Sequence, residues 1–464
     1  MKFGGTSIGN AQRIQAVAKI VASWQKTRPV VVVVSAMNKV TDLLVASAES
    51  AAKKKRTSMN RNLKQLRRLH LEAISGLGLT KPHEQALLEV INVKFEELEQ
   101  LLSSVYIIGE LSPRALDAIL CHGERLSIHL VTEAIRQAGL KAEALEASSF
   151  IRTTDQFGAA RPLLEESEKL AKKAIMPLLK RSVTPVVTGY IGSTSDGIIT
   201  TLGRGGSDYS ATILGYCLGA EEVWIWTDVD GVMTADPAVV KQAHTLRRLS
   251  YNEAAELSYF GAKVLHPLTM VPAALKQIPI LIKNSFNPKA PGTKISEQIS
   301  RNSHSGKAIA TIGDLSLITV QGKGMIGVPG VAAKVFGAIA AQNINVLFIS
   351  QASSEYNISF VVAADDGQRA VRILQETFEP EVKLKLIETV RLEEKLAILA
   401  VVGEGMRGHP GIAGKIFSAL GNSGVNIIAI AQGSSERNIS LVIKQANTKK
   451  AVNSIHQEFH LAKP

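Results

Sequence analysis

One segment of the chain occurs twice, and this duplication limits the possible folds more than any other feature. Residues 315–361 align with residues 396–442 without a gap. Both copies carry the pattern G-x-G-M-x-G-x-P-G near their start and Q-x-S-S-E near their end. The periodicity of each copy predicts a strand, a glycine turn, a helix, two strands and a second helix, within the βαββαβ plan of ferredoxin-like domains. Two copies are too few for a solenoid, so we expect a duplicated small domain.

The glycine turns of both copies also match G-x-G-x-x-G, the fingerprint of dinucleotide-binding folds, at residues 322–327 and 403–408. The sequence that follows argues against that function. In each copy the next strand ends in Q-x-S-S-E and leads into a hairpin-like turn, whereas a dinucleotide-binding fold continues into a long parallel sheet. We therefore interpret these glycines as residues of a tight turn with close helix–strand packing.

The first part of the chain has a different pattern. Apolar strand-like runs such as residues 30–37 alternate with amphipathic helical patterns such as residues 11–24. This alternation predicts an α/β fold with a mostly parallel sheet sandwiched by helices, and residues 42–105 look like a helical excursion from it. A stretch rich in Pro, Gly, Ser and Asn follows and reads as a linker. The expected boundaries are a first domain over residues 1–284, a linker over 285–307, and two small domains over 308–388 and 389–464.

Composition narrows the class of protein. The chain has 464 residues, of which 45% are hydrophobic and 20% charged, as in globular proteins of two or three domains. No apolar run reaches the ~18 residues of a membrane span and no signal-peptide pattern opens the chain, so we expect no membrane partner. The two cysteines, Cys121 and Cys217, are too few for a disulfide framework and fit a reducing cytoplasm.

The net charge of +12 raises the question of nucleic-acid binding. The densest basic stretch, residues 53–70, keeps leucines at helical spacing among its lysines and arginines. A solvated helix face explains this pattern better than a phosphate-binding stripe does, and no zinc-finger or RNA-binding motif accompanies it. We therefore expect no nucleic-acid partner.

Glycine-rich polar turns follow several of the predicted strands in the first domain. A lysine, two glycines and a serine occupy residues 2–7, ahead of a helix whose N-terminus favours an anion. Similar turns occupy residues 201–211, 226–232 and 259–267. Turns at the carboxyl ends of parallel strands meet at one edge of a sheet, so together they predict a phosphate site. The lysine precedes the glycines, so the first turn is not a Walker A loop.

This set of turns resembles the aspartate kinases, within the amino-acid kinase family. The motifs stand in that family's order and spacing: KFGGTS at 2–7, HGE at 122–124, GRGGSD at 203–208, WTDVDG at 226–231 and FGAKVLHP at 260–267. The duplicated segment resembles a pair of ACT domains. Its two Q-x-S-S-E motifs are similar to those of threonine-responsive aspartokinases and of the kinase half of bifunctional aspartokinase–homoserine dehydrogenase. The chain departs from the family at Met233 and Ala238, where Tyr and Arg are common on the nucleotide side.

The resemblance implies an enzyme that uses ATP and Mg²⁺ to phosphorylate the side-chain carboxylate of L-aspartate, the first step toward threonine, lysine and methionine. Such a reaction brings two anions together, so catalysis consists mainly of positioning and charge neutralisation. By the resemblance, Lys2 would stabilise the transferring phosphoryl group, while Asp208 would hold the lysine and help to organise Mg²⁺. No protein metal site is expected, and His122 is interpreted as structural.

The resemblance also assigns the binding residues. Arg204 would clamp the α-carboxylate of aspartate, a planar task that suits a guanidinium, and Glu124 would receive the α-ammonium. The expected substrate-binding residues are Thr41, Glu124, Arg204 and Ser207, with Ser35 as a weaker candidate. The expected nucleotide-binding residues are Lys2, Gly4, Gly5, Ser7, Thr227, Asp228 and Lys263.

The duplicated segment is expected to regulate the enzyme. Gln351 and Gln432 end equivalent strands, and their amides offer a donor and an acceptor to an amino-acid effector, threonine rather than lysine. Exposed sheet faces further predict a homodimer or a higher homo-oligomer through the ACT domains. Two alternatives stay open: a kinase for another amino acid or for carbamate, and a catalytically weak regulatory subunit that senses amino acids.

Overall fold

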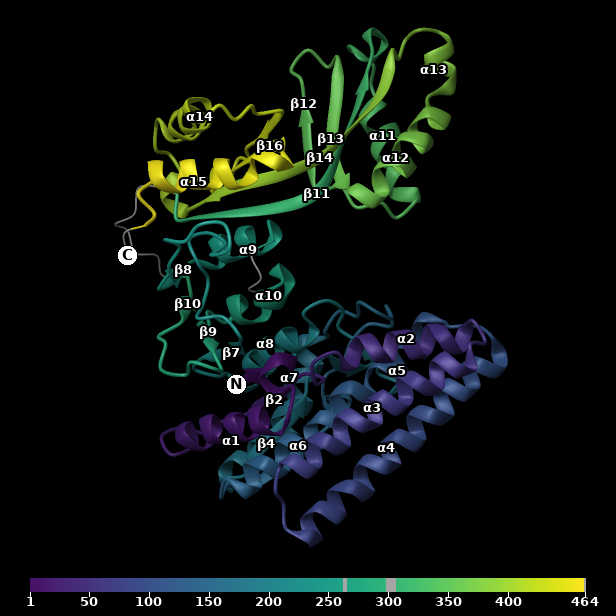
Figure 1. Cartoon of the computed structure of the whole chain (residues 1–464), viewed down its shortest axis with the longest axis vertical. Helices are drawn as coiled ribbons and strands as arrows, with labels where there is room; N and C mark the ends of the chain where they lie inside the picture. Colours follow the sequence, from purple (N-terminus) through teal and green to yellow (C-terminus); the bar gives the residue numbers. More distant parts are fainter. Residues whose placement is uncertain (262–264, 298–305, 463–464) are drawn as a thin grey trace. The chain divides into compact units, whose positions relative to one another are not determined.

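The structure is a computed structural model that describes residues 1–261, 265–297 and 306–462. The chain forms two compact units that alternate along the sequence (Figure 1). The domain boundaries expected at residues 284 and 388 stay predictions. The first unit comprises Met1–Val232, Arg247–Tyr251 and Val264–Ile299, and the second comprises Met233–Leu246, Asn252–Lys263 and Ser300–Pro464.

The first unit is built on a sheet of strand order β3-β4-β2-β1-β7-β9-β10-β8. Its neighbouring strands are parallel except for β9 and β10. This is the mostly parallel sheet that the sequence predicts. The strands are β1 (Lys2–Phe3), β2 (Val32–Val34), β3 (Ala142–Leu145), β4 (Thr184–Thr188), β7 (Val223–Thr227), β8 (Arg248–Leu249), β9 (Ile280–Asn284) and β10 (Thr293–Ile295), beside a separate hairpin of β5 (Ile191–Ser193) and β6 (Ile199–Thr201).

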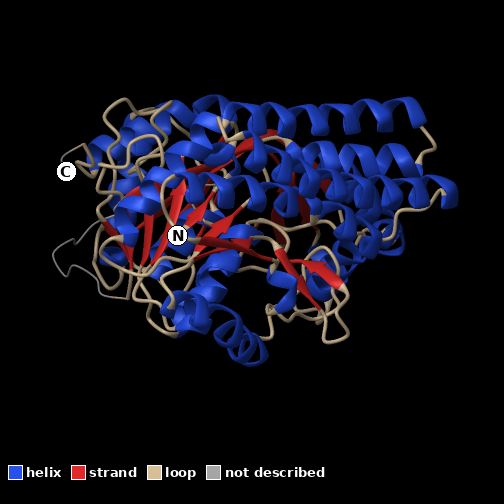
Figure 2. Ribbon diagram, turned by 90° about the horizontal axis from the view of Figure 1, so that it is seen from below, coloured by secondary structure: helices blue, strands red, loops and turns tan. Residues whose placement is uncertain are grey.

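Helices lie on both sides of these strands (Figure 2). The predicted excursion forms three long helices, α2 to α4, which pack on one another. Among the described residues, no helix combines the length and the apolar composition needed to cross a bilayer. The helices of this unit are η1 (Gly5–Ile8), α1 (Ala11–Gln25), α2 (Val40–Ala52), α3 (Arg56–Gly76), α4 (Lys81–Ile108), α5 (Pro113–Leu120), α6 (His122–Gln137), η2 (Ala147–Ser149), α7 (Leu164–Lys180), α8 (Gly206–Leu218) and α10 (Pro267–Leu275).

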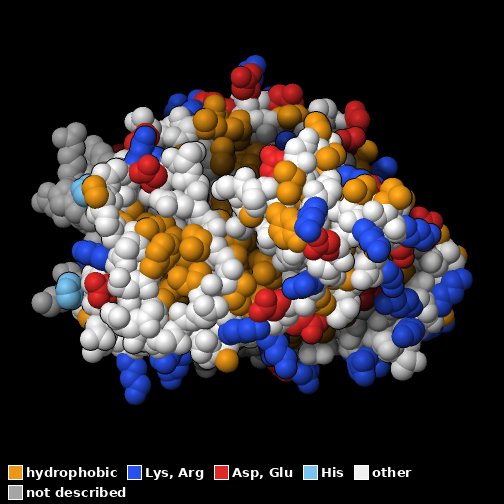
Figure 3. All heavy atoms as spheres, turned by 90° about the horizontal axis from the view of Figure 1, so that it is seen from above, with side chains coloured by type: hydrophobic (Ala, Val, Ile, Leu, Met, Phe, Trp, Pro, Cys, Tyr) orange, Lys and Arg blue, Asp and Glu red, His pale blue; other side chains and the backbone are white. Residues whose placement is uncertain are grey.

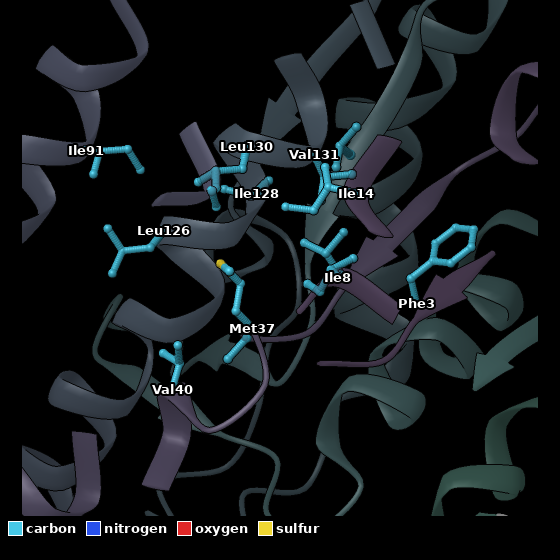
Figure 4. Close-up of a cluster of buried hydrophobic side chains, with 14 of the residues drawn as sticks. Phe3, Ile8, Ile14, Met37, Val40, Ile91, Leu126, Ile128, Leu130 and Val131 are labelled. Atoms are coloured by element: carbon cyan, nitrogen blue, oxygen red, sulfur yellow. The ribbon is translucent and has the colours of Figure 1, made fainter. Parts of the chain in front are cut away.

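The core of the first unit fixes the short strand that carries Lys2. Figure 4 shows side chains from β1, η1, α1 and α6 gathered in this core, among them Phe3, Ile8, Ile14 and Val131. The Phe3 ring stacks on Trp226 of β7, with ring centroids 5.8 Å apart. Burial of such a ring contributes roughly 1.5–3 kcal/mol, so β1 is anchored although it has only two residues.

The second unit contains a six-stranded sheet of order β12-β13-β11-β14-β16-β15, in which all neighbours are antiparallel. Each copy of the repeat follows the predicted order of elements. The strands are β11 (Ala308–Gln321), β12 (Phe348–Gln351), β13 (Asn357–Ala363), β14 (Thr389–Val402), β15 (Ala429–Ala431) and β16 (Asn438–Lys444). The helices are α9 (Tyr251–Tyr259), η3 (Lys323–Met325), α11 (Val331–Ala341), α12 (Ala364–Thr377), α13 (Glu379–Lys383), η4 (Glu404–Met406), α14 (Ile412–Asn422), η5 (Gln445–Asn447) and α15 (Thr448–Glu458).

The long strands β11 and β14 each pair with strands of both copies. The end of β11, residues 315–321, pairs with β13 in the first copy, whereas its beginning, residues 308–312, pairs with residues 398–402 beside β16 in the second copy. The beginning of β14, residues 389–393, correspondingly pairs with β11 in the first copy. The copies therefore form one continuous sheet, which the order of elements in the sequence does not reveal.

Candidate active site

Lys2 and Asp208 form an ion pair at the carboxyl edge of the sheet. The Lys2 Nζ lies 2.6 Å from Asp208 Oδ1, and the two side chains are only 10% and 16% exposed. Lys2 lies on β1 between β2 and β7, while Asp208 lies in the first turn of α8. The turn before α8 reaches this position through Gly203 and Gly205, whose φ angles of 73° and 72° favour glycine.

A cavity of about 390 Å³ surrounds this ion pair. It contains all the residues that the sequence assigns to aspartate binding and to catalysis. Gly158 and Tyr190 also line it, although the sequence analysis did not single them out; the position of Tyr190 just after the buried strand β4 is the signal that could have found it. The lining residues are Lys2, Ser35, Thr41, Glu124, Gly158, Tyr190, Gly203, Arg204, Gly205, Gly206, Ser207 and Asp208.

Glu124 is a buried carboxyl group with one oxygen unpaired. Its Oε1 accepts hydrogen bonds from the Ala36 backbone N–H at 3.0 Å and from the Ser207 hydroxyl at 3.4 Å. Its Oε2 has no hydrogen-bond partner among the residues that the structure describes. Burial raises the pKa of Glu124 to about 8, and the bonds from Ala36 and Ser207 offset only part of that rise. A bound ammonium group would donate a hydrogen bond to this oxygen, and its positive charge would balance the negative charge of the ionised carboxylate.

Arg204 provides a free cation on the wall of the same cavity. The side chain is exposed, and no hydrogen bond or ion pair to its guanidinium occurs within residues 1–261, 265–297 and 306–462. Thr41, at the start of α2, is likewise exposed at the cavity. Ser35 accepts a hydrogen bond from the Ser207 hydroxyl at 3.3 Å. The cavity thus presents a fixed cation, a free cation and an unpaired carboxylate oxygen.

The glycine turn after Lys2 packs tightly on its neighbours. The Gly4 N–H donates to the Trp226 carbonyl at 3.2 Å. A Cβ atom on Gly5 would lie 2.7 Å from the Ala36 carbonyl oxygen, so this position requires glycine. The turn therefore holds its backbone close to the end of β2.

A chain of hydrogen bonds joins this turn to the predicted nucleotide residues. The hydroxyls of Ser7 and Ser285 lie 2.8 Å apart, and the Ser285 hydroxyl donates to the Thr227 carbonyl at 3.0 Å. The Thr227 hydroxyl in turn donates to Asp228 Oδ1 at 3.2 Å. Ser285 falls in the predicted linker and was not among the predicted site residues; its place directly after an apolar strand is the signal that could have indicated it. Lys263 lies outside the described residues, and Met233 and Ala238 belong to the second unit.

In the second unit, each Q-x-S-S-E motif is hydrogen-bonded to the glycine turn of its own copy. The Glu355 carboxylate accepts a hydrogen bond from the Gly327 N–H at 2.9 Å, and Glu436 accepts one from the Gly408 N–H at 2.7 Å. A Cβ on Gly324 would lie 2.4 Å from Leu386 Cβ. These contacts agree with the interpretation of the glycines as turn and packing residues.

The two predicted effector residues are exposed. Gln351 ends β12 and Gln432 follows β15. Neither side-chain amide has a hydrogen-bond partner in the part of the chain that the structure describes. The edge strands that carry them are linked, because the Ser350 hydroxyl donates to the Ile430 carbonyl at 3.2 Å.

Helix α9 engages the second copy of the repeat. Its buried Glu253 pairs with Lys307 at 3.0 Å and accepts a hydrogen bond from the Glu404 N–H at 2.8 Å. Its Glu256 accepts a hydrogen bond from the Asn438 side chain. The equivalents of Glu404 and Asn438 in the first copy are Lys323 and Asn357, and among the described residues neither is bonded to α9. The first copy is bonded to α9 at another point, because the Tyr259 hydroxyl donates to the Leu347 carbonyl at 3.0 Å. The two copies therefore contact α9 through different residues.

Comparison with known proteins places the chain in a class. Residues 1–284 match the amino acid kinase family, and residues 318–378 and 399–459 match the ACT domain. The chain belongs to the amino acid kinase family. Within it the chain is aspartokinase-like, which confirms the resemblance and the predicted fold class.

The relatives include both bifunctional and single aspartokinases. The chain is 37% identical to bifunctional aspartokinase/homoserine dehydrogenase 2 of Arabidopsis thaliana, over the whole chain and 50% of that protein. It is 35% identical to aspartokinase 2 of the same plant, over the whole chain and 84% of that protein. It spans about half the length of the bifunctional relatives. E. coli aspartokinase III, solved with aspartate and ADP, superposes with a TM-score of 0.82 at 31% identity, over 98% of each chain.

Proposed function

We propose that the chain is an aspartate kinase, which transfers the γ-phosphoryl group of ATP to the side-chain carboxylate of L-aspartate and forms 4-phospho-L-aspartate. One observation carries the proposal: a single cavity holds the Lys2–Asp208 pair, the unpaired Glu124 Oε2 and the unpartnered Arg204. These groups complement an amino acid that has two carboxylates. The likeness to E. coli aspartokinase III, solved with aspartate and ADP, supports the same substrates.

In this proposal the cavity binds both charged groups on the α-carbon of aspartate. Arg204 clamps the α-carboxylate through its planar pair of N–H donors, and Glu124 receives the α-ammonium on Oε2. Thr41 and Ser207 support the substrate with their hydroxyls. The side-chain carboxylate is then left to face Lys2.

Lys2 acts on the reacting group itself. Its ammonium stabilises the negative charge that spreads over the transferring phosphoryl group, and Asp208 keeps that ammonium in place. The carboxylate nucleophile has no proton to lose, so no general base is required. His122 fits this view, because burial lowers its pKa to about 4 and its Nδ1 lies 3.1 Å from the Ala118 carbonyl of the preceding helix, α5.

The nucleotide is proposed to lie against the other turns. Gly4, Gly5 and Ser7 bind phosphates, and Thr227, Asp228 and Lys263 contact the rest of ATP. The described residues contain no cluster of three or more potential metal ligands. Mg²⁺ would bind through one or two carboxylates together with the substrate phosphates. Asp208 would be the carboxylate that helps to organise it, and the ion would neutralise further phosphate charge.

We further propose feedback inhibition by L-threonine through Gln351 and Gln432. E. coli aspartokinase III has been solved with lysine and aspartate, so lysine is the effector to test beside threonine. Hydrophobic side chains gather in groups on the face shown in Figure 3, and the second unit exposes Ile326, Val328 and Leu384. Exposed apolar surface of this kind favours a homo-oligomer through the ACT domains. We also propose the domain boundaries that the sequence predicts. A cytoplasmic location is proposed because Cys121 and Cys217 are too few for a disulfide framework.

One assay tests the proposed function. ATP-dependent acyl-phosphate formation is trapped as a hydroxamate with aspartate or glutamate, with and without threonine or lysine. Activity with aspartate alone, lowered by threonine, is the expected result. Activity with glutamate instead would identify a different amino-acid kinase. No product with either acid, together with threonine binding by calorimetry, would identify a regulatory subunit.

A further inference from the structure

Asp117 is a buried carboxylate that lies outside the proposed cavity and has no role in the chemistry described above. It lies on α5, whose first turn is capped by the Ser112 hydroxyl, and it is 1% exposed. No ion pair to it occurs among the residues that the structure describes. Burying a charge without a cation is costly unless hydrogen bonds replace the lost water, so the donors around Asp117 explain why it is there.

Three hydrogen bonds surround this carboxylate. Its Oδ2 accepts from the backbone N–H groups of Gly158 and Thr201, each at 2.9 Å. Its Oδ1 accepts from the Thr201 hydroxyl at 2.7 Å. All three donors come from two segments that are distant in sequence. Asp117 therefore joins the turn at residues 155–159 to the end of strand β6.

Both joined segments lead to the cavity. Gly158 lines it directly, and β6 runs at once into the turn that carries Arg204. The two segments touch backbone to backbone, because a Cβ on Gly203 would lie 3.0 Å from the Gly158 carbonyl oxygen. The Ala160 N–H also donates to the Thr201 carbonyl at 2.9 Å. Arg204 has no side-chain partner of its own among the described residues, so its position depends on the backbone of this turn.

We propose that Asp117 is a positioning residue for the turn that carries Arg204, and that it sets the affinity for the α-carboxylate of the substrate. This rests on the proposed role of Arg204 in aspartate binding. A carboxylate suits the task because both of its oxygens accept hydrogen bonds, whereas an amide keeps one acceptor oxygen and turns its N–H donors toward the Thr201 hydroxyl, which can then no longer donate to this side chain. A shift of about 1 Å in a binding group can cost on the order of 100-fold in the reaction.

The test measures steady-state kinetics of Asp117→Asn with aspartate and ATP. We expect the KM for aspartate to rise by about 10- to 100-fold, while kcat and the KM for ATP change by less than about threefold. Asp196→Asn, at the exposed turn between β5 and β6, is the matched control and leaves all three constants unchanged. A purely structural role would lower thermal stability but leave the KM for aspartate as it is, which would overturn the proposal.

Thr201 gives a milder pair of variants should Asp117→Asn fold poorly. Thr201→Val removes one of the three donors and raises the KM for aspartate, whereas Thr201→Ser keeps the hydroxyl and restores it. Equal KM values for the two variants would contradict the proposal.

A double-mutant cycle with Arg204→Gln separates the positioning role of Asp117 from the binding role of Arg204. If Asp117 acts through Arg204, the rise in KM caused by Asp117→Asn falls below about twofold in the Arg204→Gln background. Additive effects would overturn the positioning role and leave the proposed function intact. An unchanged KM for aspartate in Arg204→Gln alone would instead remove the proposed role of Arg204.

Discussion

The two units differ in how far their candidate binding residues are fixed before a ligand binds: the first unit combines paired, buried residues with the exposed Arg204 and Thr41, whereas both predicted effector residues of the second unit are exposed. In the first unit Lys2, Glu124 and Asp208 are largely buried and already hold partners before any ligand is present. In the second unit Gln351 and Gln432 stand exposed, with no partner for their amides among the described residues. Charges fixed in a poorly solvated cavity stabilise a transition state without reorganising, whereas a regulatory ligand must bind two states unequally. The difference fits a rigid reaction site and an adaptable sensing site.

A second contrast separates the two copies of the repeat. Their motifs make the same bonds, from Glu355 to Gly327 and from Glu436 to Gly408. Among the described residues, α9 is bonded to the second copy through Glu404 and Asn438, and to the first copy through the Leu347 carbonyl. Duplication thus preserved the turn geometry while the surroundings of each copy diverged.

The largest effect is expected for Lys2→Ala. Removing the ammonium from the transferring phosphoryl group should lower kcat by about 100- to 1,000-fold, with the KM for aspartate changed less than about threefold. Steady-state kinetics measure it, and Lys19→Ala on the exposed face of α1 is the control. Equal turnover of Lys2→Ala and wild type would remove Lys2 from the reaction site.

Glu124→Gln should raise the KM for aspartate by about 30- to 100-fold, because the ammonium loses a charged acceptor. In the unaltered protein the KM should also fall as the pH rises from 6.5 toward 8.5, since the pKa of Glu124 is about 8 and pairing requires the ionised form. The glutamine variant should lose that pH dependence. A KM profile that is the same in both proteins would contradict the pairing.

The raised pKa of Glu124 should also make the free energy of unfolding depend on pH. The folded protein holds the Glu124 proton up to about pH 8, whereas the unfolded chain releases it near the ordinary value of 4.5. The unfolded state therefore binds fewer protons between these values, and the free energy of unfolding should decrease as the pH rises through this window. Chemical denaturation of wild type and Glu124→Gln at pH 5 and pH 8 measures it, and the variant should gain stability relative to wild type at pH 8.

Alanine substitutions of Gln351 and Gln432 should have unequal effects if the different contacts of the two copies with α9 influence threonine binding. Gln351→Ala should raise the threonine concentration for half-inhibition by about tenfold, as loss of hydrogen bonds worth roughly 1–1.5 kcal/mol implies. Gln432→Ala should raise it by only about two- to threefold, with kcat unchanged in both. Inhibition curves measure the shift. Identical shifts would indicate that α9 does not distinguish the copies.

The smallest effect should be the same in both copies. Glu355→Gln and Glu436→Gln each weaken a charge-assisted hydrogen bond to a glycine N–H, at a cost of about 0.5–1.5 kcal/mol in the free energy of unfolding. Denaturation curves of the two variants measure it. A large difference between them would show that the shared geometry hides unequal energetics.

Much of the fold could be predicted because its signals are local. The amphipathic pattern of residues 11–24 predicted a helix, and α1 spans it with Ile14, Val17 and Val21 buried. The gapless repeat predicted two like sets of elements. The pairing of β11 and β14 with strands of both copies was not predictable, since pairing between strands distant in sequence leaves no periodic trace in either one.

The candidate site was predictable only in part, for a similar reason. Lys2, Glu124, Arg204 and Asp208 stand in motifs, so a resemblance found them. Asp117 and Ser285 carry no motif, and their importance lies in which backbone groups they meet across the fold. The unpaired state of Glu124 Oε2 likewise depends on burial by several segments at once.

The amino-acid sequence by itself determined the α/β alternation, the duplicated small domain and the set of polar turns, because hydrophobic period and glycine content act over a few neighbouring residues. Only the tertiary structure decided which turns face one cavity, which carboxylates are deprived of water, and how the two copies share a sheet. Those properties arise from contacts between distant segments, where burial and hydrogen bonding depend on the whole packed molecule.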